Sequence, residues 1–205
     1  MLPLLVDLTG KKVLVFGGGE VGLRKARYFA KEAQVVVIGR DLDDGFEGEN
    51  VRLVRCDVTE CLRDWIGWAD YVVAATDSRD LNDQVCSAAA SLGKQYNRAD
   101  GLGSFLIPSV VDRGNFIVAI STLGRSPAVS RKLREQIDAA LPTEWSSMVE
   151  LQEELREEAK RRLPDQRSRE AFLRSVLEDA DVREALRSDP SAARELALRK
   201  LDGGG

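Results

Sequence analysis

The stretch "KVLVFGGGEVGLRKA", residues 12–26, decides the fold. It begins with a short, continuous apolar run, which is typical of a strand buried on both faces of a parallel sheet. A cluster of glycines follows, and after it the sequence favours a helix from about Val21 to Lys31. Strand, glycine turn and helix in this order predict the first crossover of an α/β fold.

The pattern repeats downstream of this stretch. Further apolar runs occupy residues 33–39, 51–58, 69–77 and 94–100, and residues 81–93 favour a helix. This rhythm predicts a Rossmann-like doubly wound parallel sheet, with the weaker run at 51–58 near an edge. We expect an α/β domain over residues 1–112.

The pattern changes after the sheet. Two apolar runs within residues 104–122 are separated by "DRGN", which indicates an antiparallel hairpin. Ser126 followed by Pro127 then predicts a capped helix that runs to about Leu141. We expect residues 113–145 to form a separate segment of hairpin plus helix.

Residues 146–205 predict a helical C-terminal domain. Ser147 and Glu150 fit a capping box at the start of a helix. Pro164 and the pair Asp189–Pro190 predict breaks between helices. Three apolar residues are expected on one buried helical face: Met148, Leu151 and Leu155.

Composition restricts the classes of function. The chain has 205 residues and a formal net charge of −4, which gives no general attraction to nucleic acid or to an anionic membrane surface. No apolar run approaches the roughly 20 residues that span a bilayer, and the first residues lack a signal-peptide pattern. We therefore expect a cytoplasmic protein. Its three cysteines, Cys56, Cys61 and Cys86, are expected as free, mostly buried thiols.

The chain has no histidine and no C-x-x-C pair, so we expect no metal site. Without an imidazole, proton transfer near neutral pH has to use a carboxylate, an amine, a phenol, a thiol or water.

Gly17, Gly19 and Gly22 fit G-x-G-x-x-G between a strand and a helix. In a dinucleotide site the first glycine permits the tight turn, the second lets the backbone approach the pyrophosphate, and the third lets the helix pack on the sheet. The helix dipole favours the diphosphate at this position. Gly18 is the remaining glycine candidate on this loop.

The motif expects an acid about twenty residues further on, where Asp41 lies. Asp41 could bond the ribose hydroxyls, which favours NAD, whereas Arg40 beside it could pair with the 2′-phosphate of NADP. A role for Asp41 in the turn alone also stays open. Ala75 and Thr76 close the run at 69–77 and are expected beside the cofactor, while Asn82 is expected to cap the next helix.

A second group of candidates follows the last strand of the sheet. Asp100 lies on the loop that leaves it, and Arg98 comes just before. A carboxylate near the nicotinamide is the natural proton acceptor in a chain without histidine, although a turn residue before Gly101 is the simpler alternative. Downstream candidates for binding an anionic substrate are Arg125, Arg131 and Arg134. Ser126 is explained by helix capping alone, and the last two arginines could equally be solvated helix charges.

Taken in order, these stretches closely resemble the precorrin-2 dehydrogenase family, the NAD-dependent module of sirohaem synthases. The resemblance covers about the first 145 residues, and the later helices match more weakly. It rests on these motifs: "LPLLVDLTGKKVLVFGGGEVGLRKA", "VVVIGRDL", "VVAATD", "YNRAD…SFLIPSVVDRGNFIVAIST" and "GRSPAVSRKLRE".

The resemblance implies NAD-dependent oxidation of precorrin-2, an anionic tetrapyrrole, to sirohydrochlorin. It implies that Asp100 is the general base or the essential carboxylate, and that Glu20, Val21, Arg40 and Asp41 contact NAD. It also implies a substrate contact for Ser126 and an intertwined homodimer, with residues 113–145 as the dimerisation segment.

The sequence departs from the family pattern in places. "NRAD" replaces the commoner "NVVD", so Arg98 either reaches a substrate carboxylate or points to solvent. Leu123 stands where glycine is frequent, which questions the backbone geometry of that loop. Two alternatives stay open: a bifunctional enzyme that also inserts Fe²⁺, and a module that senses NAD(H) without chemistry.

Overall fold

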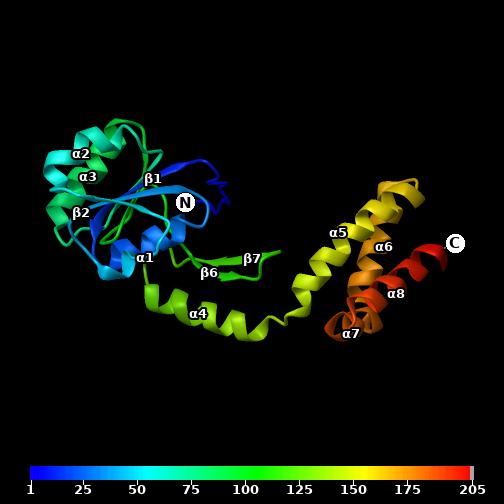
Figure 1. Cartoon of the computed structure of the whole chain (residues 1–205). Coiled ribbons are helices and arrows are strands. Elements are labelled where there is room, and N and C mark those ends of the chain that lie inside the picture. Colours follow the sequence, from blue (N-terminus) through cyan, green and yellow to red (C-terminus); the bar gives the residue numbers. More distant parts are fainter. Residues whose placement is uncertain (204–205) are drawn as a thin grey trace. The chain divides into compact units, whose positions relative to one another are not determined.

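The computed structural model describes residues 1–203, whose contacts form two compact units (Figure 1). The first unit holds residues 1–107 and 123–125, and the second holds residues 108–122 and the described residues from 126 onward. The hairpin and the helix after it thus group with the C-terminal helices. The finer division into residues 1–112, 113–145 and 146–205 stays a prediction. The last two residues of the predicted helical domain, 204–205, lie outside the described residues.

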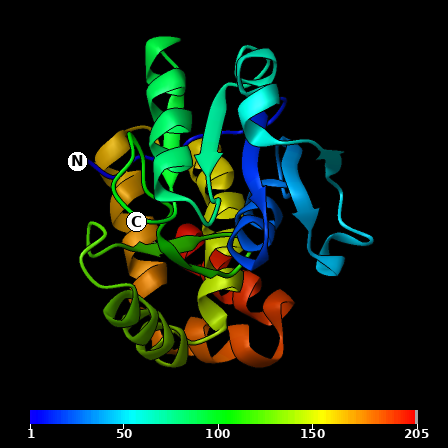
Figure 2. The same cartoon turned by 90° about the vertical axis from the view of Figure 1, so that its left-hand side faces the viewer.

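The first unit is built on a five-stranded sheet in which every neighbouring pair is parallel (Figure 2). Its order is β3-β2-β1-β4-β5, so the chain moves outward from β1 in one direction and then in the other. This confirms the doubly wound sheet and the edge position of the run at 51–58. The strands are β1 (Lys12–Gly18), β2 (Gln34–Leu42), β3 (Arg52–Arg55), β4 (Tyr71–Ala74) and β5 (Gln95–Arg98).

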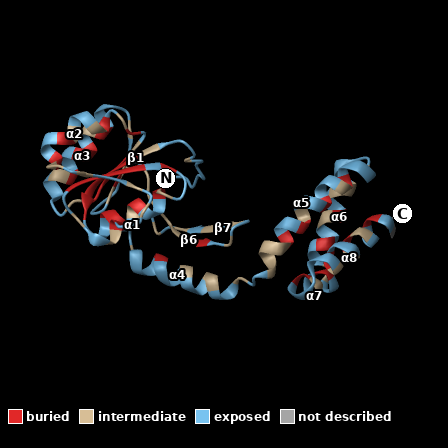
Figure 3. Ribbon diagram, in the orientation of Figure 1, coloured by how far each residue is buried: buried red, intermediate tan, exposed pale blue. Residues whose placement is uncertain are grey.

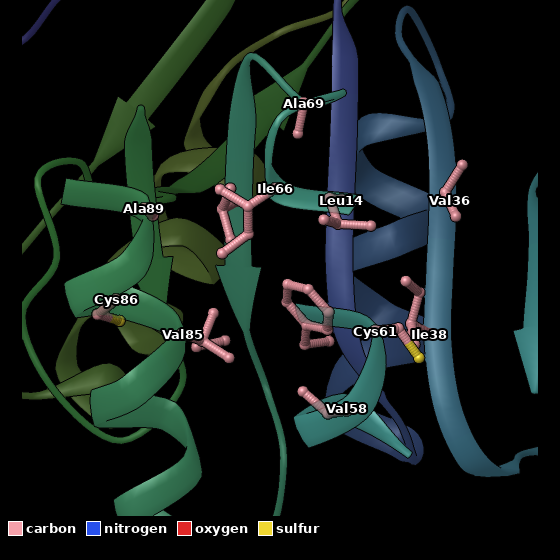
Figure 4. Close-up of a cluster of buried hydrophobic side chains, with 13 residues drawn as sticks. Leu14, Val36, Ile38, Val58, Cys61, Ile66, Ala69, Val85, Cys86 and Ala89 are labelled. Carbon is pink, nitrogen blue, oxygen red and sulfur yellow. The ribbon is translucent and has the colours of Figure 1, made fainter. Parts of the chain in front are cut away.

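Helices cover both faces of this sheet because β1 is apolar at every interior position. Val13 and Val15 pack on one face with side chains of α1 (Glu20–Phe29). Leu14 and Phe16 point to the other face, against α2 (Val58–Ile66) and α3 (Arg79–Ser91), as Figure 4 shows for that cluster. Because side chains alternate along β1, one helix covers one face of the sheet and two helices cover the other face.

Helix α2 was not predicted from the sequence. Asp57 caps it by accepting a hydrogen bond from the Thr59 N–H at 2.9 Å, and its buried face carries Cys61 and Ile66. The structure also joins Cys56 and Cys61 in a disulfide, with Cα atoms 6.6 Å apart. The prediction of three free thiols is thus wrong for this pair, because the first turn of α2 brings Cys61 back to the end of β3. Cys86 is free and buried.

The second unit begins with the predicted hairpin, β6 (Ser109–Asp112) and β7 (Ile117–Ile120). Helix α4 (Pro127–Ala140) follows, and Ser126 caps it as predicted. The remaining helices are α5 (Glu144–Arg162), α6 (Gln166–Glu178), α7 (Ala180–Ser188) and α8 (Pro190–Gly203).

Buried side chains of α5 to α8 form one apolar cluster, visible as the red segments of these helices in Figure 3. Met148, Leu151 and Leu155 lie in it, as predicted. The predicted breaks at Pro164 and Asp189–Pro190 are confirmed. The capping box is not, because α5 already begins at Glu144 and Ser147 lies inside it. Among residues 1–203, the structure has no helix with the length and apolarity to cross a membrane.

Candidate active site

The glycine turn lies at the carboxyl end of β1, and three of its glycines are fixed by the protein itself. Gly17 has φ +113°, which favours glycine, and a Cβ there would overlap the backbone of Ala75. A Cβ at Gly18 would overlap the Asp41 carbonyl, and one at Gly22 would overlap the Gly17 carbonyl. The turn is therefore packed as closely against β2, β4 and α1 as the backbone allows.

Gly19 is different. It is the N-cap of α1, has φ −82°, and a Cβ added there would meet no heavy atom within 4 Å. No side chain caps the first N–H groups of α1. Open space directly before uncapped helix N–H groups is what a diphosphate requires, so these residues fit the pyrophosphate of a dinucleotide. Glu20 and Val21 form the exposed start of this helix.

Arg40 and Asp41 lie in the last part of β2 and are both exposed. The register between β1 and β2 is interrupted here, and Gly18 pairs with Leu42. The Arg40 guanidinium lies 3.6 Å from a carboxylate oxygen of Asp57, the cap of α2, and its side chain remains 76% exposed. Both candidates are thus at the carboxyl edge of the sheet, where the adenosine side of a dinucleotide would lie.

The end of β4 is held by a buried amide. Asn82, only 1% exposed, accepts hydrogen bonds from the Thr76 N–H at 3.0 Å and from the Thr76 hydroxyl at 2.8 Å. Its Nδ2 donates to the Thr76 carbonyl at 3.2 Å. The prediction that Asn82 caps α3 is wrong, because Ser78 caps this helix through the Leu81 N–H. Ala75 is 8% exposed and touches the Gly17 backbone.

Asp100 follows β5 and is engaged by Arg98. The Arg98 Nε donates to one Asp100 oxygen at 2.8 Å, and Nη2 donates to the other at 3.1 Å. The third contact of this guanidinium is Nη1 to Asp83 on α3, at 2.5 Å. The Arg98 hydrogen bonds hold the pKa of Asp100 down to about 2, and a side-chain hydrogen bond from Asn82 acts in the same direction. Asp100 is therefore ionised at neutral pH.

Strands β1, β4 and β5 are adjacent in the sheet, and their carboxyl ends carry the glycine turn, Thr76 and Asp100. This edge is where ligands bind in doubly wound sheets. The structure thus brings the first group of sequence candidates and Asp100 to one edge of one unit.

Comparison with known proteins assigns the family. Residues 4–109, half of the chain, match a family described as putative NAD(P)-binding. The precorrin-2 dehydrogenase of Methanosarcina barkeri (strain Fusaro / DSM 804) is 40% identical over 189 residues, which cover 88% of this chain and 84% of that protein. The chain belongs to the precorrin-2 dehydrogenase family.

Two further comparisons define the extent of the likeness. The siroheme synthase of Stutzerimonas stutzeri (strain A1501) is 32% identical, and the match covers 98% of this chain but 44% of that protein. The chain therefore spans less than half the length of this relative. The solved structure of SirC, a precorrin-2 dehydrogenase, has the same fold, with a TM-score of 0.73 at 23% identity over 98% of this chain and 99% of that one.

The downstream candidates of this precorrin-2 dehydrogenase family member belong to both units. Arg125, in the first unit, is exposed. In the second unit the Ser126 hydroxyl accepts from the Val129 N–H at 3.3 Å, so capping explains it structurally. Arg131 is exposed, and Arg134 lies 3.7 Å from Asp138, one turn further along α4.

The sequence raised a question about the backbone geometry at Leu123, and the structure answers it. Leu123 has φ +55°, the left-handed conformation that glycine adopts without a steric cost. Among residues 1–203, no group of three or more histidine, cysteine or acidic side chains is placed to hold a metal ion.

Sequence reasoning missed two polar residues of the sheet edge. Asp83 on α3 accepts a hydrogen bond from the Arg98 guanidinium. Lys25 on α1 donates to the Asn97 Oδ1 at 2.6 Å, and Asn97 in turn donates to the Phe105 carbonyl at 3.0 Å. Burial, with a smaller contribution from Arg24, lowers the pKa of Lys25 to about 8. A buried Asn in the last strand was the available signal, since buried amides need partners.

Proposed function

We propose that this protein oxidises precorrin-2 to sirohydrochlorin with NAD⁺, as a step in sirohaem synthesis. The observation that carries the proposal is the ionised Asp100 at the same sheet edge as the open glycine turn, in a chain of the precorrin-2 dehydrogenase family. The reaction removes a hydride and a proton from the substrate. NAD⁺, when bound, supplies the hydride acceptor.

The residues of the chain bind the cofactor and take up the proton. Gly19 and the N–H groups of α1 hold the diphosphate, Asp41 accepts from the ribose hydroxyls, and Ala75 and Thr76 form the floor beside the nicotinamide. Asp100 acts as the general base, because its ionised form has the free lone pairs that take up a proton. Its negative charge also stabilises the positive charge that hydride departure leaves on the substrate.

Substrate recognition is proposed for the arginines outside the turn. A tetrapyrrole with carboxylate side chains needs cationic partners, and guanidinium groups bind carboxylates bidentately. Arg125 and Arg131 are exposed and Arg134 is half-buried, so their side chains are accessible to such a ligand. Ser126 completes the proposed substrate contacts, whereas Arg98, which the sequence also offered for this role, is held by Asp100 and Asp83.

We further propose a homodimer that forms through the hairpin and α4. Its support is apolar surface on these elements. Ile117 on β7 is 44% exposed, and Val129 and Leu133, one turn apart on α4, are 49% and 40% exposed. Light scattering, which measures the molar mass in solution, tests this proposal on the double variant Val129→Glu/Leu133→Glu. We expect a dimer for the wild type and a monomer for the variant. The cytoplasmic location expected from the sequence stays a prediction.

The test of the reaction is turnover. Wild-type protein with NAD⁺ and precorrin-2 should give growing NADH absorbance and the sirohydrochlorin spectrum. Asp100→Ala should lower kcat by about 10²–10⁴-fold, the usual contribution of an acid or base, with NAD⁺ affinity nearly unchanged. Asp64→Ala, an exposed acid near the last turn of α2, is the matched control. Wild-type turnover by Asp100→Ala would remove the role given to Asp100.

A further inference from the structure

Arg98 is one of the residues in which this chain departs from its family pattern, and its side chain is only 15% exposed. It lies between two carboxylates, Asp100 on the loop and Asp83 on α3. The bond pair to Asp100 is bidentate, with both carboxylate oxygens engaged. Bidentate guanidinium–carboxylate pairs fix orientation as well as position.

The backbone leaves room for this arrangement. A Cβ at Gly101 would lie 3.1 Å from both Cδ and Nε of Arg98, so the arginine stem passes close over the glycine that follows Asp100. Arg98 pairs with Ala74 in the register between β5 and β4, on the face of the sheet covered by α3. The strand therefore directs Arg98 toward Asp83.

We infer that Arg98 is a positioning residue for the oxidation, which holds Asp100 as an oriented, ionised carboxylate, while Asp83 in turn holds Arg98. The inference rests on the proposed function, which it deepens. A row of charged side chains then connects α3 to the carboxyl edge of the sheet, in the order Asp83, Arg98, Asp100. Asn82 meets Asp100 from the same helix and connects it to Thr76 beside the proposed nicotinamide position.

The charges around Asp100 make this arrangement testable. Arg98 contacts Asp100 directly, and Asp83 contacts the same guanidinium. The Cys86 thiol, whose pKa is raised by burial, interacts with both carboxylates. Removal of the guanidinium leaves Asp83 and Asp100 as like charges with no cation between them, which favours protonation of Asp100. Removal of Asp83 as well should relieve part of that effect.

The experiment compares Arg98→Met, Asp83→Asn and the double variant. For Arg98→Met we expect kcat to fall about 10²-fold, as for a misplaced reacting group, with the KM for NAD⁺ within about twofold of wild type. The midpoint of the acid limb in the pH profile of kcat/KM should shift from below pH 4 to pH 4 or above. Asp83→Asn should cost about tenfold or less in kcat, and the double variant should be faster than Arg98→Met. Asp80→Asn on the same helix is the matched control and should be unchanged.

A substrate-binding role for Arg98 predicts something else: a raised KM for the tetrapyrrole, an unmoved acid limb and no rescue by Asp83→Asn. That pattern would overturn the inference.

Carboxyl ¹³C NMR of the free protein provides a readout that needs no turnover, with the Asp100 signal assigned from Asp100→Asn. The signal should not titrate above pH 3 in wild type and should titrate at or above pH 4 in Arg98→Met. A wild-type titration near pH 4 would overturn the anchoring by Arg98. The expected titrations without any turnover of precorrin-2 would instead overturn the proposed function.

Discussion

Asn82 holds Thr76 with three hydrogen bonds, two accepted by its Oδ1 and one donated by its Nδ2. The amide thereby fixes the backbone at the end of β4 from the first turn of α3. Because Asn82 is 1% exposed, these groups have no access to water that could replace the bonds.

Asn82→Ala is therefore expected to destabilise the fold by about 2–4 kcal/mol, since it removes three hydrogen bonds that a buried side chain makes to Thr76. It should also raise the Kd for NAD⁺, because the strand end beside the nicotinamide loses its fixed position. Urea unfolding and NAD⁺ titration measure the two effects. Ser78→Ala is the control: loss of the cap of the same helix should cost about 1 kcal/mol and leave NAD⁺ affinity unchanged. Equal effects of both variants on NAD⁺ binding would contradict the assignment.

Gly19→Ala separates folding from cofactor binding. The backbone at Gly19 has φ −82° and ψ −174°, which alanine adopts readily, and the new methyl group meets no protein atom within 4 Å. The free energy of unfolding should change by no more than about 0.5 kcal/mol, the usual limit for an uncrowded site. The methyl group would occupy the space of the diphosphate, so NAD⁺ binding should weaken at least about tenfold, a loss of about 1.4 kcal/mol.

Gly67→Ala provides the control for this variant, because it too meets nothing within 4 Å but lies at the end of α2. It should bind NAD⁺ as the wild type does. Unchanged NAD⁺ affinity in Gly19→Ala would show that the diphosphate does not lie on this turn.

The sequence was most informative where a local pattern of residue types is enough to define the structure. The apolar run of residues 12–18 and its glycines predict β1, the turn and α1, because buried parallel strands and G-x-G-x-x-G each depend on local geometry. Helix α2 was missed because its cap, Asp57, follows a weakly apolar strand and its buried face is short. Contacts between distant residues were less accessible. The bond from Arg98 to Asp83 spans 15 positions and depends on how α3 packs on β5, which no local pattern encodes.

Leu123→Gly should stabilise the protein. A non-glycine residue in the left-handed region costs about 1–2 kcal/mol, whereas glycine has no such cost but loses more backbone entropy on folding. The net gain should be about 0.5–1 kcal/mol in the free energy of unfolding. Leu92→Gly is the control, since Leu92 is similarly exposed but has φ −97°, and there the substitution should destabilise. A loss of stability in both variants would show that Leu123 makes contacts worth more than its strained backbone costs.

The lowered pKa of Lys25 should make the protein more stable as the pH rises. This pKa is lowered from 10.5 to about 8 in the folded protein, so between these values the unfolded chain binds more protons than the folded one. The free energy of unfolding should therefore rise with pH in this window and should carry the full cost of the buried ammonium below pH 8. Between pH 7.5 and 10 the wild type should gain about 1–3 kcal/mol relative to Lys25→Met, at up to about 1.4 kcal/mol for each pH unit. Lys11→Met, at an exposed position, controls for other titrating groups and should follow the wild-type curve. Parallel curves for wild type and Lys25→Met would mean that the Lys25 ammonium is not desolvated in the folded protein.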